Sequence, residues 1–438
     1  MCRIPGAARS PALPKRHGFP SVAGEVDQVS SLLTTLRMLL QPARASGTDL
    51  VPVYEQAFAR TILGNGTLAL AFPRGRVALW AILKALDVNG DSEVILPAYT
   101  CETVPMAVKF AGAKCVYTDV EPGRYNSSLR DVANVVTERT KAIICQHTYG
   151  IAQPIEDWIE FANANRVLLI EDRCQLVKNG SQGGPTAALG SVAYFSTHFS
   201  KPFSTAQGGF AAFSDARLHT AVERVRAAFP YENDRRCSRS VALQSLLYSV
   251  AVRPSNRAVI ASLFRWAQRA GLIRGTIAAD EYGGVMPPNY LSRATNVHAV
   301  LGMKQLRLWH ENCRHRHRLT RFYLDRLASL GVDVSSFTAR DDDPVLLMVP
   351  VLAQNKGEVL RRAATKGLPI GTWFDRCPAH THADTARRYD YRPDQCPNAE
   401  RLISTEIHLL TAPWVTERQA GKAIRFIEKC ARLTTTMN

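Results

Sequence analysis

Short apolar runs alternate with segments of helical periodicity from about residue 66 onward, and this alternation predicts the fold. The apolar runs are TLALAF (67–72), EVILP (93–97), KCVYTDV (114–120), KAIICQHTYG (141–150), RVLLIED (166–172), SVAYFS (191–196) and GFAAFS (209–214). Helical spacing follows the first four runs, in GRVALWAILKAL (75–86), TVPMAVKFAGA (103–113), SLRDVANVV (128–136) and IEDWIEFANAN (155–165). Such alternation is typical of an α/β fold, in which a mostly parallel sheet carries helices on both faces.

The C-terminal part of the chain has a different pattern. Residues 215–284 are helical and less regular, and a helix pair is predicted over 297–330. An apolar run, PVLLMVPVLA (344–353), and helices over 358–365 and 416–433 indicate a smaller α/β unit. The predicted organisation is an N-terminal arm and helix (1–50), a large domain (51–290) with a helical insertion (216–284), and a C-terminal small domain (291–438).

Composition limits the class of protein. Of the 438 residues, 46% are hydrophobic and 21% are charged, as in ordinary globular proteins. No stretch reaches the roughly 18 consecutive apolar residues of a membrane span, and the N-terminus lacks the apolar block of a signal peptide, so we predict cytoplasmic residence. The ten cysteines show no C-x-x-C pair and no ligand-like spacing to histidines, which argues against a metal site or a disulfide framework.

The formal net charge of +16 favours anionic partners. The basic residues are spread along the chain without a zinc-finger, zipper or RNA-binding signature, so we do not predict nucleic-acid binding. Phosphorylated small molecules and anionic lipid are the other candidates. Arg and Trp on the helices of 216–284 leave a peripheral membrane contact open, although packing on the domain or on a partner subunit is the commoner arrangement.

Two polar side chains follow neighbouring apolar runs. Asp172 ends RVLLIED, and Lys201 follows SVAYFS in what the pattern predicts to be an exposed turn between two buried strands. In doubly wound α/β folds, ligands bind beyond the carboxyl ends of the strands. Asp119 and His147 also follow apolar runs, and for His147 a structural role is as common as a functional one. A helix cap alone would account for Asp172 in an arbitrary α/β protein.

A carboxylate and a lysine at one edge of a sheet are the two groups that pyridoxal phosphate (PLP) chemistry requires. The lysine holds the cofactor aldehyde as an imine, and the carboxylate keeps the pyridine nitrogen protonated so that the ring accepts electrons. The phosphate needs hydroxyl groups and a helix N-terminus. These are supplied by Ser196, Thr100 and the turn at Gly75 and Arg76, which opens a helix.

Seven segments, in order, resemble the DegT/DnrJ/EryC1/StrS family of PLP-dependent sugar aminotransferases, from about residue 50 to the C-terminus. They are GRVALWAILKAL (75–86), DSEVILPAYTCETVPMAVKFAGAKCVYTDVEPGRYN (91–126), TERTKAIICQHTYG (137–150), LLIEDRCQ (168–175), YFSTHFSKPFSTAQGG (194–209), RATNVHAVLGMKQL (293–306) and CPNAERL (396–402). The resemblance implies the fold of the PLP-dependent transferases of the aspartate aminotransferase type (type I), with a large domain and a smaller C-terminal α/β domain.

The resemblance also implies roles for individual residues. Lys201 matches the Schiff-base lysine, and Asp172 matches the partner of the pyridine nitrogen. Gln175 matches a side chain that touches the ring or its 3-hydroxyl group. The other matches are Ser196, Gly75 and Arg76 at the phosphate, and Arg293 in a segment that reaches across a homodimer interface towards the neighbouring active site.

Five positions depart from the family pattern. Arg74-Gly75-Arg76 replaces Ser-Gly-Thr, so an arginine offers a charged donor where a threonine hydroxyl meets the phosphate. Cys101 stands where an aromatic side chain often stacks on the pyridine ring, and a thiol provides much less area. Leu291 replaces an asparagine that contacts the phosphate across the interface, and Arg173 replaces a small residue beside the aspartate.

The implied activity is transfer of an amino group from an amino acid, with glutamate as the expected donor, to a keto-sugar nucleotide in polysaccharide or natural-product biosynthesis. Lys201 favours amino transfer over dehydration, because the related sugar dehydratases have histidine there. Asp375 and His380, in GTWFDRCPAHTH, lie in the C-terminal domain, which helps to shape the substrate entrance in the family. Two alternatives stay open: a catalytically weakened member that acts as a binding or regulatory protein, and a PLP-dependent sugar dehydratase.

Overall fold

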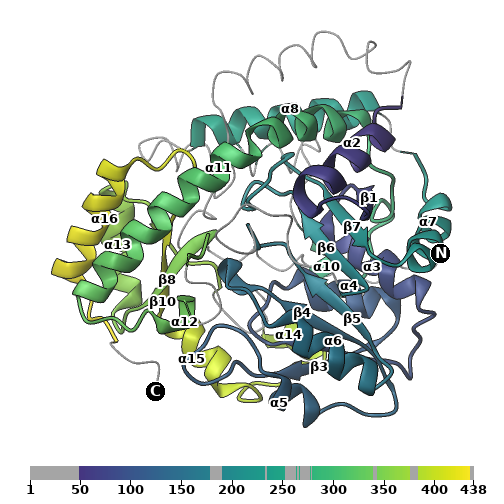
Figure 1. Cartoon of the computed structure of the whole chain (residues 1–438), viewed down its shortest axis with the longest axis horizontal. Coiled ribbons are helices and arrows are strands. Elements are labelled where there is room, and N and C mark those ends of the chain that lie inside the picture. The colour runs from purple at the N-terminus through teal and green to yellow at the C-terminus, as the bar shows by residue number, and fades with distance from the viewer. Residues whose placement is uncertain are drawn as a thin grey trace, which may run out of the picture.

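The fold is built on two sheets (Figure 1). A computed structural model describes residues 49–177, 190–231, 234–251, 279–338, 343–374 and 383–434, and the single positions 263, 266 and 277. The predicted N-terminal helix, most of 252–278, Asp375 and His380 lie outside the described residues.

The larger sheet has seven strands in the order β1-β7-β6-β5-β4-β2-β3. They are β1 (Leu68–Phe72), β2 (Glu93–Pro97), β3 (Lys114–Thr118), β4 (Thr140–Gln146), β5 (Leu168–Asp172), β6 (Val192–Ser196) and β7 (Gly209–Phe213). The strands from β6 to β3 pair in parallel, and β7 pairs antiparallel with both β1 and β6. The predicted strands and the mostly parallel sheet are confirmed.

Helices cover both faces of this sheet. Helices α3 (Gly75–Ala85) and α4 (Thr103–Ala111) share a core with Val94 and Leu96 of β2. Helices α5 (Leu129–Ala133) and α6 (Ile155–Ala164) share a second core with Ile95 and Ile143, on the opposite side of the strands. Neighbouring residues of one strand therefore belong to different cores, as expected for parallel strands that are buried on both faces.

The smaller sheet is antiparallel, in the order β8-β10-β9. Its strands are β8 (Met348–Leu352), β9 (Ile370–Gly371) and β10 (Glu406–Leu410). The helices of this half are α12 (Ser335–Thr338), α13 (Lys356–Thr365), α14 (Ala383–Arg388), α15 (Pro397–Thr405) and α16 (Glu417–Cys430). The two sheets fall within the two predicted domains, whose boundary near residue 290 remains a prediction.

The remaining elements connect and border the two sheets. They are α2 (Val51–Phe58), a π-helix (Ala59–Leu63), a 3₁₀ turn (Thr148–Gly150), α7 (Ala216–Ala227), α8 (Asp234–Ala251), α10 (Ala279–Tyr282) and α11 (Asn296–Ser329). In the part of the chain that the structure describes, no helix is both long and apolar enough to span a membrane.

A single helix of 34 residues, α11, joins the two halves of the molecule. It contacts α2 beside the large sheet and α16 beside the small one (Figure 1). The predicted helix pair over 297–330 is therefore wrong. The segment contains no proline and a single glycine, Gly302, so nothing in it breaks the helical hydrogen bonds. Packing against α2 and α8 in one half and against β8 and α16 in the other stabilises its full length.

Gly302 lets α11 approach α2 closely. A Cβ atom on Gly302 would lie 2.1 Å from the ring of Tyr54, which is itself 1% exposed and packs edge-on against Phe210. We expect Gly302→Ala to lower the free energy of unfolding by about 1–3 kcal/mol, because a buried ring must move. Urea unfolding measures the loss.

Gly357 provides the matched control. It lies in the first turn of α13, where an added Cβ meets no atom within 4 Å. Gly357→Ala should be neutral or raise stability by up to about 1 kcal/mol. Equal stabilities of the two variants would contradict this account of the contact between α2 and α11.

Candidate functional site

Lys201 lies in the loop that joins β6 to β7. The residue is 8% exposed, so the predicted exposed turn is wrong. The loop is buried because the ring of Phe203 packs against Phe58 and Trp309, with centroids 5.8 and 6.3 Å apart. In addition, Lys201 Nζ lies 4.4 Å from the centroid of the Trp373 ring. The amine is therefore held against an aromatic face at the end of β6.

Asp172 ends β5, the strand next to β6. Its Oδ1 accepts a hydrogen bond from the backbone N–H of Cys174 (2.9 Å), and its Oδ2 accepts one from the hydroxyl of Tyr194 (2.5 Å). Tyr194 is the residue opposite Asp172 in the pairing of β5 with β6. Both oxygens of this carboxylate, which is 5% exposed, are thus fixed by the two strands.

The charges of Asp172 and Lys201 act on a common neighbour. Burial raises the pKa of the Cys174 thiol well above its usual value; the Asp172 carboxylate raises it further, and Lys201 opposes this. The Cys101 thiol is also affected: burial and then Glu102 raise its pKa, whereas Lys201 lowers it. Asp172 ends β5, and Lys201 and Cys101 follow β6 and β2, which run parallel to β5 in the same sheet, so all three lie at its carboxyl edge.

The N-terminus of α3 meets the ends of β6 and β7 at this edge. A Cβ atom on Gly75 would lie 2.9 Å from the carbonyl oxygen of Phe195 and 3.0 Å from Ser196 Cβ, and one on Gly209 would lie 2.4 Å from the nitrogen of Gly75. Only glycine permits this approach of backbone to backbone. No side chain caps the helix at Arg74, so its first N–H groups stand beside Ser196, in the arrangement that binds anions.

Arg76 points into a buried ion pair. Its Nη2 donates to Glu281 Oε1 at 2.8 Å, both side chains are at most 5% exposed, and the guanidinium lies 5.7 Å from the centroid of the Tyr290 ring. In the described structure the guanidinium thus neutralises a carboxylate of the chain itself. The anion-binding groups of this turn are therefore the backbone N–H groups of α3 and the Ser196 hydroxyl.

Three further predicted residues line the same edge. The Thr100 hydroxyl donates to Gln146 Oε1 (2.5 Å), and Gln175 Oε1 accepts a hydrogen bond from the backbone N–H of Tyr149 (2.7 Å). The Cys101 thiol accepts one from the Thr103 hydroxyl (3.3 Å). Because the carboxamide oxygen of Gln175 is engaged, its amide hydrogens are the donors that it can offer a ligand.

Arg293 lies apart from this group. Its Nη1 donates to the hydroxyl of Tyr231 (2.6 Å), its Nη2 donates to the carbonyl of Ala227 (2.7 Å), and the guanidinium stacks 4.4 Å from the Tyr231 ring centroid. These contacts place it at the C-terminal end of α7. Its contact with a neighbouring subunit stays a prediction.

A fully buried charge cluster flanks Asp172. Glu171 pairs with Arg173 (2.8 Å), and both side chains have no exposed surface. His147 Nε2 lies 3.2 Å from Glu171, and its Nδ1 accepts the backbone N–H of Gln153 (3.1 Å). Since Nδ1 accepts, Nε2 carries the proton and donates it to Glu171. Both ring nitrogens of His147 are used within the chain, which favours its structural role.

Asp119 has a structural role as well. Its two carboxylate oxygens accept the backbone N–H groups of Asn398 (2.9 Å) and Ala399 (2.8 Å) at the start of α15. Asp119 thus caps a helix of the small domain from the edge of the large sheet.

The sequence matches a known family over most of its length. Residues 32–248 and 255–428 match the profile of the DegT/DnrJ/EryC1/StrS aminotransferase family. The chain belongs to this family. GDP-perosamine synthase from Escherichia coli O157:H7 is 30% identical to it over 175 residues, which are 40% of this chain and 48% of the relative. The match thus spans about half the length of that DegT/DnrJ/EryC1/StrS relative.

Solved structures share the fold of this chain. DesV of S. venezuelae superposes with a TM-score of 0.69 at 20% identity, over 93% of this chain and 97% of that one. The Bacillus subtilis protein NtdA, solved with bound cofactor PMP, gives a TM-score of 0.67 at 17% identity over 95% and 86% of the two chains. The predicted fold is confirmed, and PLP and the aminotransferase class are confirmed at the level of the family.

The residues present fit the PLP of DegT/DnrJ/EryC1/StrS proteins. A buried amine (Lys201), a buried carboxylate with both oxygens fixed (Asp172) and an uncapped helix N-terminus beside a hydroxyl (Ser196) are the three binding groups that this cofactor needs. Gly75 has no side chain where α3 meets the strand ends, so a phosphate can come close to the backbone N–H groups of this turn.

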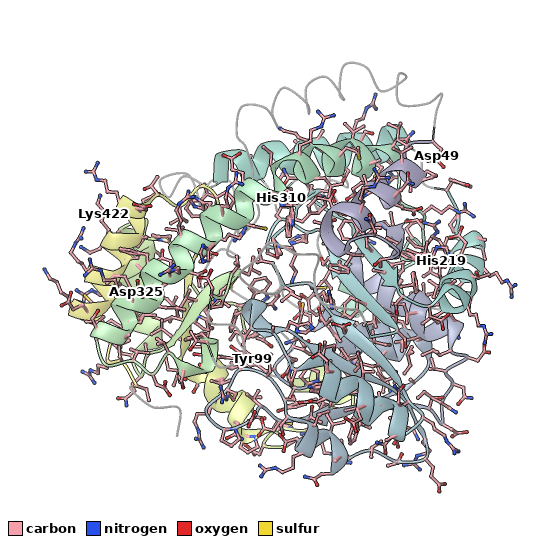
Figure 2. The ribbon with its side chains drawn as sticks, viewed as in Figure 1. Asp49, Tyr99, His219, His310, Asp325 and Lys422 are labelled. Atoms are coloured by element: carbon pink, nitrogen blue, oxygen red, sulfur yellow. The ribbon has the colours of Figure 1, made fainter. Side chains whose placement is uncertain are left out.

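Residues of the small domain complete the site, and sequence reasoning missed the main one. Trp373 faces Lys201, and its neighbour Phe374 packs edge-on against Tyr99, with centroids 4.5 Å apart. Tyr99 lies where the large sheet faces the small one (Figure 2). The segment GTWFDRCPAHTH was singled out for Asp375 and His380, whereas its tryptophan carried no recognisable signal. Tyr194 was findable, since pairing the neighbouring runs puts it opposite Asp172.

Removal of the Glu171 charge tests the cluster beside Asp172. Glu171→Gln leaves Arg173 buried without its counter-charge, so the free energy of unfolding at neutral pH should fall by about 3–5 kcal/mol. Burial raises the pKa of Glu171, but the charge of Arg173 and the hydrogen bond from His147 hold it below its usual value. The ion pair therefore stabilises the folded protein above the usual pKa of Glu, and this stabilisation is lost as the pH falls through the lowered pKa of Glu171. The unfolding free energies of wild type and variant should therefore converge in acid.

Urea unfolding at several pH values measures this difference. Glu358→Gln is the matched control, because Glu358 forms an exposed pair with Arg362 (3.1 Å) and its loss should change stability little. A Glu171→Gln protein as stable as wild type at neutral pH would contradict the role given to the buried pair.

Proposed function

We propose that this chain is a homodimeric, PLP-dependent aminotransferase that moves an amino group from glutamate to a keto group on a nucleotide-linked sugar. The observation that carries the proposal is the meeting of Lys201, Asp172 and the bare N-terminus of α3 at one edge of the large sheet. Each group answers one need of the cofactor, and the sequence brings them from three separate segments.

In this proposal, Lys201 Nζ holds the cofactor aldehyde covalently, and Asp172 holds a proton on the pyridine nitrogen. Gln175 donates an amide hydrogen to the ring hydroxyl, Thr100 and Cys101 border the ring, and Ser196 with the N–H groups of Gly75 and Arg76 binds the phosphate. The cofactor supplies an aldehyde that exchanges amines and a ring that accepts electrons. With the cofactor and the amino-acid donor bound, Lys201 Nζ would be the base that takes the proton from the donor's α-carbon.

The net charge of the chain and its similarity to a known protein both support the class of acceptor. A net charge of +16 steers a diphosphate-bearing substrate towards the protein. One relative is named as a GDP-perosamine synthase, which supports a nucleotide-linked sugar as the acceptor. The product would serve the assembly of a polysaccharide or natural product, and the enzyme would act in the cytoplasm, where both substrates are available.

The departures from the family pattern define the competing function. Arg76 pairs with Glu281, and Cys101 offers no ring to stack on the cofactor. A chain that binds PLP or a sugar nucleotide without turnover would act as a binding or regulatory protein. A sugar dehydratase is the other alternative, against which the presence of Lys201 argues.

Transfer of labelled nitrogen tests the proposal. Wild-type protein with PLP, ¹⁵N-glutamate or ¹⁵N-glutamine and a panel of keto-sugar nucleotides should yield a labelled amino sugar in mass spectra. Lys201→Ala should lower the rate by more than about a thousandfold, because both the covalent link and the base are lost. Lys141→Ala, at an exposed position of β4, is the control and should match wild type.

Each other outcome of this assay decides against the proposal. A sugar that loses water without gaining label would identify a dehydratase. A wild-type protein that binds PLP and a sugar nucleotide but transfers no label would support the binding or regulatory function.

A further inference from the structure

Trp373 presents an aromatic face to the reactive amine. Its ring centroid lies 4.4 Å from Lys201 Nζ, and the residue is partly exposed, whereas its neighbour Phe374 is fully buried. A partly exposed indole beside a buried amine is available to a ligand without rearrangement of the core. None of the roles described above uses it.

Hydrogen bonds to Glu406 and Lys356 anchor the two chain neighbours of Trp373. The Thr372 hydroxyl donates to Glu406 Oε2 (3.1 Å), and Lys356 Nζ donates to the carbonyls of Phe374 (3.3 Å) and Ile403 (2.5 Å). Glu406 in turn contacts His408 (3.0 Å), and neither side chain has exposed surface.

These partly buried hydrogen bonds hold the residues on both sides of Trp373, and Phe374 is further held against Tyr99. The indole therefore stands on a rigid support. Binding groups that are held in place before the ligand arrives cost less ordering on binding, which is typical of specificity-determining residues.

The reaction brings substrate carbons to this place. A substrate nitrogen that took the place of Lys201 Nζ would lie beside the Trp373 ring, whose centroid is 4.4 Å from Nζ, and would bring the atoms next to it to the same ring. A pyranose ring has faces of C–H bonds, and these carry the partial positive charge that the negative face of an indole attracts. The amino-acid donor has no ring to place there.

We infer that Trp373 forms one wall of the acceptor site and stacks on the C–H face of the sugar ring. The inference rests on the proposed function and adds to it a residue that distinguishes the acceptor from the donor. Trp373 is then a specificity-determining residue for one of the two half-reactions.

Two variants test the inference on the PLP-loaded enzyme. In Trp373→Leu, the KM for the keto-sugar nucleotide should rise by about two- to tenfold, because the aromatic contribution is lost, whereas Trp373→Phe keeps a ring and should stay near wild type. The rate of the half-reaction with glutamate and the fraction of PLP fixed to the protein by borohydride report the contact of Trp373 with Lys201, and any loss in them should be smaller than the rise in the acceptor KM.

A binding measurement gives a readout that is independent of turnover. In calorimetric titration of the enzyme loaded with PMP, which cannot exchange amines with the aminated sugar nucleotide, Trp373→Leu should weaken the affinity for that product by the same factor, and titration with the free nucleotide diphosphate should not distinguish the variants. Far-UV circular dichroism and urea unfolding check that both variants fold.

Two results would overturn the inference. Unchanged acceptor KM and product affinity in Trp373→Leu would remove the stacking role. Equal losses in the glutamate half-reaction and in PLP fixation would show that Trp373 acts on Lys201 instead. A wild-type enzyme that aminates no sugar nucleotide is a separate result, seen without any variant, and would overturn the proposed function together with this refinement of it.

Discussion

The close approach of two backbones, at Gly75 and Gly209, is the constraint on which the site depends. A Cβ atom on Gly209 would lie 2.4 Å from the Gly75 nitrogen, so neither position tolerates a side chain without a shift of α3 or of the strands. The contact sets the N-terminus of α3 beside Ser196 and on the same edge as Asp172 and Lys201. A phosphate bound there would be held by groups whose positions the fold itself determines.

Charge burial around this contact follows one rule. Glu171 with Arg173, Arg76 with Glu281, and Glu406 with His408 each place a carboxylate against a basic side chain inside the protein. A buried charge without a partner costs several kcal/mol, so these pairs are strongly interdependent even where their net contribution to stability is small. Glu171 and Arg173 are the chain neighbours of Asp172, and Arg76 lies in the first turn of α3, so two of the three pairs adjoin groups of the site.

Much of the fold was predictable because the alternation of apolar runs and helices fixes a parallel sheet, and a parallel sheet fixes which residues share an edge. The apolar pattern alone therefore predicts that Asp172 and Lys201 lie at the same edge of the sheet. The resemblance to the family added Gln175 and agreed with the phosphate-binding turn at Gly75 that the chemistry of PLP had already suggested. Their roles in binding remain predictions, whereas their positions at one edge follow from the strand order.

What the sequence did not reveal depends on contacts between distant segments. Arg76 pairs with Glu281 of α10, which lies 205 residues further along the chain. Because the two residues are so far apart in sequence, no local pattern predicts the pair. The loop of Lys201 has the composition of a surface turn, but α2, α11 and Trp373 cover it. The continuous α11 was divided in two because helices of 34 residues are rare, although no residue in it requires a break.

The most direct test of the account is the position of the covalent bond. Purified protein is incubated with PLP, its visible absorbance is recorded, and the adduct is reduced with borohydride and mapped by peptide mass spectrometry. The account predicts a chromophore and a single modified peptide that carries the label on Lys201. Label on another lysine, or a wild-type protein that forms no chromophore with PLP in excess, would contradict it.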